Sequence, residues 1–292
     1  MHAQGESKPG TNQAMPLKSL YKFVQGAAVL AAVSAATLAT PLNAQGDLLV
    51  APTRVILDGS RGTEVILSNI GSEEATYRIG LELRRMLENG RLVPVEKVDA
   101  NAVEEAALGM IRYAPRRITL PPGQPQAVRL AARPGADLAD GEYRVHMSFK
   151  AIPKPRSVTD EEPRSEGVSI QLIPIYGVTI PIIVRHGRVE AQVAIDQPQI
   201  VQGKDGPELA LNITRTGDSS TYGELRVTKA GVADPLVLLR GIAIYPEIGE
   251  RHVRIRLTQE QAASLSGQLR FEYRDMPEAG GAVIAAVDAF VG

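Results

Sequence analysis

The sequence predicts an all-β protein made of two β-sandwich domains. Apolar and polar residues alternate in short runs separated by turn residues, which is typical of strands in antiparallel sandwiches. Only one short stretch, 101–108, has a helical pattern. The chain has 292 residues, enough for two domains that each bury a core of ordinary size.

An N-terminal leader precedes the first predicted strand. Lys18 and Lys22 come before an apolar, alanine-rich stretch over 23–38, and the small-residue pattern 42–44 follows it. This order is that of a secretory signal peptide, which we place at 1–44. An uncleaved membrane anchor is the alternative, but the apolar stretch is short and interrupted by polar residues. We therefore expect an exported protein without stable membrane insertion.

The first domain is predicted at 45–186. Its expected strands, in chain order, are Leu48–Leu57, Thr63–Ser68, 77–83, Arg91–Val95, Met110–Tyr113, Arg117–Leu120, Gln126–Leu130 and 143–149. In the last of these, His146 alternates with apolar neighbours and is expected at an exposed position. The proline-rich, charged segment 153–167 is predicted to be a solvated loop.

The second domain is predicted at 187–292, after a hinge at Arg185–Gly187. Its expected strands are Glu190–Ile195, Glu208–Thr214, Leu225–Lys229, Leu236–Ile244, His252–Leu257, Gln268–Tyr273 and Val283–Phe290. The block Gly217–Ser220 has the sequence GDSS, which also occurs around nucleophilic serines. Without a downstream Asp-x-x-His, it is better interpreted as a turn between strands.

The longest alternating run covers 167–185, and every even position from Val168 to Val184 is apolar. A strand in a globular domain usually has only about 5–6 residues. The run also contains Pro174 and Pro181, which a central strand does not accommodate because each removes a ladder donor. We therefore predict an edge strand with an apolar face, of the kind that can pair with a partner's sheet. The alternative, that these residues only fill the domain's own core, stays open.

Composition narrows the function classes. Lys plus Arg (32) balances Asp plus Glu (33) at a net charge of −1, so nothing indicates a nucleic-acid partner. The chain has no cysteine, its four histidines are scattered, and it has no glycine-rich phosphate loop. We expect no catalytic residues, no metal and no cofactor, and hence a protein that is not an enzyme.

Three passages resemble the periplasmic pilus chaperones, the PapD-like family. They are Ala51–Gly59 (APTRVILDG), Arg112–Leu130 (RYAPRRITLPPGQPQAVRL) and Glu142–Pro153 (EYRVHMSFKAIP), the last followed by the charged loop and the long alternating run. The resemblance implies two immunoglobulin-like domains in a boomerang arrangement. It also implies a periplasmic chaperone that completes pilus subunits by donor-strand complementation and delivers them to an outer-membrane usher.

The same resemblance implies roles for individual residues. Val168, Ile170 and Leu172 align with the donated triplet. Arg54 aligns with the arginine that binds the C-terminal carboxylate of the subunit, with an ordinary exposed arginine as the alternative. The interdomain salt bridge of the family falls on Glu142, Arg185 and Asp275, although three unrelated surface charges remain an equal alternative.

The chain departs from the family at one important position. The lysine that partners the carboxylate-binding arginine falls on Pro181, which cannot hold a carboxylate. Arg54 would then act alone or with another base, or the client's C-terminal end would bind elsewhere. Two further questions stay open: the free protein can hide its strand in a self-capping homodimer, and the chain can instead be a structural subunit of a surface fibre built from Ig-like domains.

Overall fold

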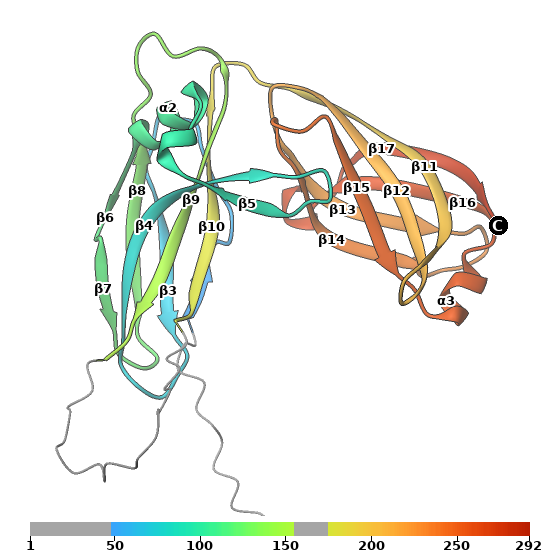
Figure 1. Cartoon of the computed structure of the whole chain (residues 1–292), viewed down its shortest axis with the longest axis horizontal. Helices are drawn as coiled ribbons and strands as arrows, with labels where there is room; N and C mark the ends of the chain where they lie inside the picture. The colour runs from blue at the N-terminus through green and yellow to red at the C-terminus, as the bar shows by residue number, and fades with distance from the viewer. Residues whose placement is uncertain (1–47, 155–174) are drawn as a thin grey trace, which may run out of the picture. The chain divides into compact units, whose positions relative to one another are not determined.

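The computed structural model describes residues 48–154 and 175–292, which form two β-sandwiches, each built from two sheets (Figure 1). The buried apolar residues fall into one core from Val50 to Val184 and another from Ile195 to Val291. The predicted all-β, two-sandwich fold is confirmed. The predicted signal peptide lies outside the described residues. Within these residues, no helix has the length and apolarity needed to cross a membrane.

The first sandwich consists of a four-stranded sheet facing a larger one. The smaller sheet has the order β1 (Leu48–Ala51), β3 (Thr63–Asn69), β8 (Pro125–Ala132) and β6 (Ile111–Ala114). The larger has the order β2 (Val55–Leu57), β10 (Gly177–His186), β9 (Gly141–Ile152), β4 (Ala75–Met86) and β5 (Leu92–Val95), with β7 (Arg117–Leu120) also paired to β4. This order is that of an immunoglobulin-like sandwich.

The run expected to be a single strand, Leu48–Leu57, is two strands in different sheets. The first part, β1, pairs with β3, whereas β2 pairs with β10 in the facing sheet. Pro52 lies between them, and a proline cannot donate to either ladder. The same change of sheet occurs between β6 and β7, where Pro115 separates a strand paired with β8 from one paired with β4.

The central strand β9 is buried on both faces. Tyr143, Val145, Met147 and Phe149 face the core, as their alternation predicts. The expectation that His146 is exposed is wrong, because only 1% of its surface is accessible. It stands in register between Glu82 on β4 and Pro181 on β10, and Ser148 on the same face of β9 is also buried, so this face of the strand is covered.

Burial changes the titration of His146. Desolvation, together with the nearby positive charge of Arg144, lowers its pKa from 6.5 to about 3. Neither ring nitrogen has a hydrogen-bond partner among the described residues. The folded protein therefore holds a neutral imidazole, while the unfolded chain takes up a proton below about pH 6.5. This group stabilises the fold fully above that pH, and its contribution is lost as the pH falls towards 3.

The second sandwich has a three-stranded and a four-stranded sheet. The first contains β11 (Ala191–Gly203), β12 (Gly206–Gly217) and β15 (Glu250–Arg256); the second has the order β14 (Val237–Ile244), β13 (Thr221–Thr228), β16 (Gly267–Asp275) and β17 (Val283–Val291). Short 3₁₀ segments occur at η1 (Lys97–Asp99) and η2 (Pro277–Ala279). Two helices complete the fold, α2 (Ala102–Met110) and α3 (Gln259–Ser264), and a capping box starts each of them.

A third, smaller apolar cluster joins residues of the two sandwiches. Met86 and Ile183 pack in it with Ala243 and Tyr245. The turn between β4 and β5 adds a backbone bond, since the His252 amide donates to the carbonyl of Glu88 at 2.7 Å. The two cores are therefore connected by packed side chains as well as by the chain itself.

Candidate functional site

Half of strand β10 has a free edge. The strand pairs with β9 along its whole length, from Gly177 to His186. On its other edge, β2 pairs only with Ile182–Val184. From Gly177 to Pro181, the edge that faces away from β9 therefore has no strand partner within residues 48–154 and 175–292. Unpaired backbone groups at the edge of a strand can bond to a strand of another chain.

The hydrogen-bond phase of β10 shows which backbone groups lie on that edge. The Ala151 amide donates to the carbonyl of Tyr176 at 2.9 Å, which places the backbone groups of even-numbered residues towards β9. The odd-numbered residues Gly177, Thr179 and Pro181 therefore face outwards. Pro181 removes no hydrogen bond between β10 and β9, because the N–H group that it lacks would point to the outer edge.

The side chains of β10 change environment along the strand. Ile180, Ile182 and Val184 are buried in the first core. Before the strand begins, Ile175 is 65% exposed and Tyr176 is 48% exposed. The free edge thus continues, towards the N-terminus, into exposed apolar side chains. The predicted donor triplet Val168, Ile170 and Leu172 lies outside the described residues.

Arg54, the predicted carboxylate anchor, lies just before β2 and meets residues of the second sandwich. Its Nη2 donates to Ser220 Oγ at 3.0 Å, and its Nη1 donates to Tyr245 Oη at 3.2 Å. The guanidinium carbon is 4.7 Å from the ring centroid of Tyr222 and 5.5 Å from that of Tyr245. Among the described residues, no carboxylate forms an ion pair with Arg54.

A cleft of about 610 Å³ opens beside this guanidinium. Arg54 and Arg185 line it together, and Tyr222 lies in the same wall. Asp275 and Glu278 also border the cleft. A carboxylate-bearing ligand that enters the cleft thus meets two guanidinium groups, whose forked donors suit a carboxylate.

Glu142 and Arg185 form an ion pair beside the cleft, in which Glu142 is buried and Arg185 is 35% exposed. Glu142 Oε2 accepts from Arg185 Nε at 3.2 Å, from the Ser220 amide at 2.9 Å and from Ser220 Oγ at 2.8 Å. Arg185 Nη2 also donates to the Ser220 carbonyl at 3.0 Å. The Glu142 side chain is 0% exposed, and the donors to Oε2 offset part of the cost of burying its charge, whereas Oε1 has no hydrogen-bond partner among the described residues.

Of the three residues predicted to form an interdomain salt bridge, the structure pairs two, and both of these lie in the first sandwich, on the neighbouring strands β9 and β10. Glu142 and Arg185 are paired, and Ser220 of the second sandwich is bonded to both. Asp275 lies along the same cleft, but within the described part of the chain no ion pair joins it to Arg185. Ser220 occupies the place that the sequence prediction gave to an aspartate.

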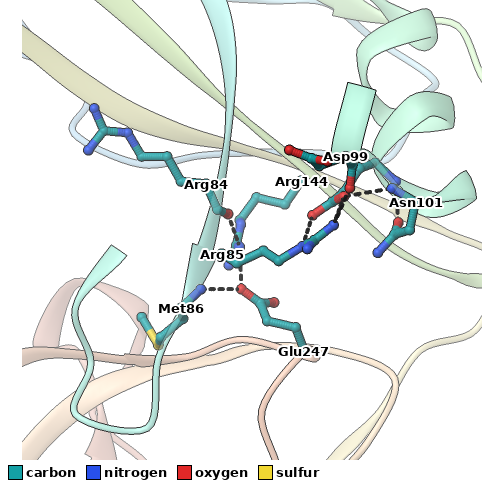
Figure 2. A network of polar contacts seen from close by, with 8 residues as sticks. Arg84, Arg85, Met86, Asp99, Asn101, Arg144 and Glu247 are labelled. Carbon is teal, nitrogen blue, oxygen red and sulfur yellow. Dashed lines mark hydrogen bonds and ion pairs between the residues drawn. The ribbon is translucent and has the colours of Figure 1, made fainter. Parts of the chain in front are cut away.

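A second polar network lies near the apolar cluster (Figure 2). Arg144 Nη2 donates to Glu247 and to the carbonyl of Arg84, and the Met86 amide donates to Glu247 Oε1 at 2.8 Å. The Arg144 guanidinium carbon is 3.5 Å from the ring centroid of Tyr245. Tyr245 therefore contacts both Arg144 and Arg54.

The same view shows how helix α2 is attached to strand β4 (Figure 2). Arg85 donates two bonds of 2.7 Å to the carboxylate of Glu104 and one of 2.9 Å to the carbonyl of Asp99. The Arg85 guanidinium holds the pKa of Glu104 below its ordinary value. Glu104 also accepts from the amide of Asn101, which closes the capping box.

Sequence reasoning missed Ser220, Tyr222 and Tyr245. The block that contains Ser220 does follow β12 as a turn, but Ser220 is 3% exposed and bonded across the domain boundary. Two tyrosines close to one arginine cannot be recognised from positions 54, 222 and 245 alone. No group of three or more potential metal ligands occurs among residues 48–154 and 175–292.

The chain is similar in fold to solved structures of fimbrial chaperones. The YadV chaperone is 13% identical with a TM-score of 0.45, and the match covers 84% of this chain and 100% of that one. The class 5 fimbriae chaperone CfaA is 13% identical with a TM-score of 0.44, covering 84% and 99%. The CupB2 chaperone of Pseudomonas aeruginosa is 12% identical with a TM-score of 0.42, covering 84% and 100%.

No protein-family model and no curated sequence matches the chain. The TM-scores of these three matches are below 0.5, so the description of the fold rests on the strand pairing given above.

Proposed function

We propose that this chain is a periplasmic chaperone that stabilises pilus subunits by donor-strand complementation and delivers them to an outer-membrane usher. The observation that carries the proposal is the free edge of β10 over Gly177–Pro181, next to the exposed side chains of Ile175 and Tyr176. An edge of this kind is an aggregation hazard unless a partner strand takes it.

Main-chain pairing suits a protein that serves several clients. The outward backbone groups of Gly177 and Thr179 can bond to any strand, whatever its side chains. Specificity then comes from the alternate apolar side chains, for which we propose Val168, Ile170 and Leu172. Burying each of them in a client's incomplete core would contribute about 1.5–3 kcal/mol.

We propose Arg54 as the site of the client's C-terminal carboxylate. It is charged, borders the cleft and has no carboxylate partner among the described residues. Pro181 stands where the related chaperones have a lysine, and Arg185 lines the same cleft. Arg185 is therefore our candidate for the second positive charge; it pairs with Glu142 within the first sandwich, and both residues bond to Ser220 of the second. Asp275, in the same cleft, is kept as a candidate third member.

A structural subunit of a fibre is less well supported. A subunit that waits for a donated strand has an incomplete sandwich, whereas both sandwiches here bury their own cores between two sheets. What lacks a partner among the described residues is instead an edge of β10, and an unpaired strand edge beside a complete core suits a donor of a strand better than an acceptor.

Co-expression tests the proposal. A candidate pilus subunit, encoded beside an usher-like outer-membrane barrel, is produced with the wild type or with the double variant Ile170→Asp and Leu172→Asp. We expect soluble subunit to be recovered from the periplasm only with the wild type. Val98→Asp is the matched control, because Val98 is 89% exposed and lies in η1, outside the sheets. Equal recovery with the double variant would contradict strand donation.

The state of the free protein is a separate question. We propose a self-capping homodimer that covers the free edge until a client arrives. Light scattering of the purified protein, alone and after addition of subunit, measures this directly. A monomer at all concentrations would rule out self-capping without affecting strand donation.

A further inference from the structure

We infer that Ser220, Tyr222 and Tyr245 of the second sandwich are positioning residues for Arg54, so that its carboxylate-binding geometry exists only where the two sandwiches are docked. The inference rests on the proposed role of Arg54 as the anchor of a client carboxylate. The inference identifies the residues that hold the Arg54 side chain in place. It also explains why the carboxylate site lies in a cleft at the domain boundary.

The contacts of the Arg54 guanidinium all come from the second sandwich. Ser220 and Tyr245 accept its two hydrogen bonds, and the rings of Tyr222 and Tyr245 flank it. No side chain of the first sandwich bonds to this guanidinium among the described residues. A free arginine side chain samples many rotamers, and fixing it costs up to about 2 kcal/mol. Contacts made before the ligand arrives remove that cost from binding.

The partners of Arg54 are neutral, which distinguishes it from other arginines nearby. Arg185 is paired with Glu142, Arg144 with Glu247 and Arg85 with Glu104. Hydroxyl groups and aromatic faces orient a guanidinium without cancelling its charge. Arg54 is thus held in place and still carries a full positive charge towards an incoming anion.

The hydroxyl of Ser220 has a defined direction. Its single proton is donated to Glu142 Oε2 at 2.8 Å, which leaves its lone pairs for Arg54 Nη2 at 3.0 Å. Ser220 therefore connects the carboxylate-binding arginine to the Glu142–Arg185 pair. Tyr245 makes a second connection, because its ring contacts Arg144 on the side of the other network.

Room and donors remain for a ligand. A guanidinium has five N–H donors, and the two described bonds of Arg54 leave others for a carboxylate. The adjoining cleft of about 610 Å³ is large enough for the end of a polypeptide chain. The chemical class of the ligand is therefore a chain terminus with a free carboxylate.

The test uses the mature full-length protein and a small probe. N-acetylglycine imitates a C-terminal carboxylate, and N-acetylglycinamide has the same shape without the charge. Binding is followed by NMR through the Arg54 Nε–H signal, which is assigned with Arg54→Lys. We expect saturable binding of N-acetylglycine and none of the amide. Ser220→Ala and Tyr245→Phe should each weaken binding about 3–10-fold, the effect of one hydrogen bond.

Matched variants separate positioning from stability. Ser220→Thr keeps the hydroxyl and should restore binding to within about twofold of the wild type. Tyr113→Phe and Ser264→Ala remove the same hydroxyl groups away from the cleft and should leave binding unchanged. Thermal unfolding of every variant identifies those that lose affinity only because they unfold. A purely structural role would lower stability without rescue of binding by threonine.

Two results would overturn the inference. One is unchanged affinity in Ser220→Ala and Tyr245→Phe while Arg54→Ala abolishes binding, because Arg54 would then need no positioning. The other is the absence of probe binding to the wild type, which removes Arg54 as an anchor but leaves the co-expression test of strand donation untouched. Conversely, if the co-expression test fails but the probe still binds, the proposed function is contradicted and the inference about the Arg54 site is not.

Discussion

Two neighbouring residues of β10 differ in the direction of their amide groups. The amide of Val178 faces β9, opposite Phe149, whereas that of Thr179 faces the free edge. Replacing each with proline removes one donor and adds a ring at that place. Each of the two proline variants therefore tests one edge of β10.

The expected effects on stability follow from the ladder. Val178→Pro leaves the buried carbonyl of Phe149 without its donor and should cost about 2–4 kcal/mol of unfolding free energy. Thr179→Pro breaks no backbone bond of the folded chain and should cost less than about 1 kcal/mol. Thr179→Ala corrects for its side chain, which makes one long bond of 3.5 Å to Glu82. Urea unfolding monitored by circular dichroism measures all three.

For client binding, we expect Thr179→Pro to have the larger effect of the two proline variants. Thr179→Pro removes one intermolecular bond and pushes its ring into the partner strand, which should cost about 1–3 kcal/mol of binding free energy. The client's dissociation constant should therefore rise about 5- to 150-fold, while Thr179→Ala changes it little. If Thr179→Pro destabilises the fold as much as Val178→Pro, the deduced phase of β10 is wrong. If it leaves client binding unchanged, the free edge is not the binding surface.

Three further predictions concern stability alone. Glu142→Gln should lower the unfolding free energy by about 1.5–3 kcal/mol in urea, because it weakens hydrogen bonds to a buried charge, whereas Glu64→Gln, in the exposed pair with Arg129, should change it by less than about 1 kcal/mol; equal losses would contradict the role of burial. Gly90→Ala, at a φ of 79° and with its new Cβ against the Arg251 guanidinium, should lower the melting temperature more than Gly123→Ala, at a φ of 69° in open space. His146→Leu should reduce the slope of stability between pH 6.5 and 3 by up to about 1.4 kcal/mol per pH unit, and an unchanged slope would show that His146 is not buried as a neutral group.

Local patterns predicted most of the strands. The alternation at Tyr143, Val145, Met147 and Phe149 corresponds to the core-facing side of β9. The helical stretch at 101–108 corresponds to α2, whose capping residue Asn101 was included. Helix α3 was missed, although Thr258 and Gln261 form a capping box that the sequence displays. These features depend on residues a few positions apart, so they can be read from sequence.

Features that depend on distant neighbours could not be predicted. The alternation of His146 is compatible with either an exposed or a covered face, and only the adjacent strands β4 and β10 decide between them. The change of sheet after β1 depends on which strand lies beside each half. Ser220 and Tyr245 meet Arg54 across sequence separations of 166 and 191 residues, so no local pattern connects them.

The alternating orientation along β10 constrains chain length more than residue identity. Deleting one residue between Tyr176 and Ile180 would exchange the inward and outward sets of everything before the deletion, so that side chains now in phase with the core would point away from it. A substitution in this segment changes the contacts of one side chain, whereas a deletion changes the orientation of every side chain before it. Homologues of this protein should therefore vary in composition over 175–181 but keep the same number of residues before the buried Ile182.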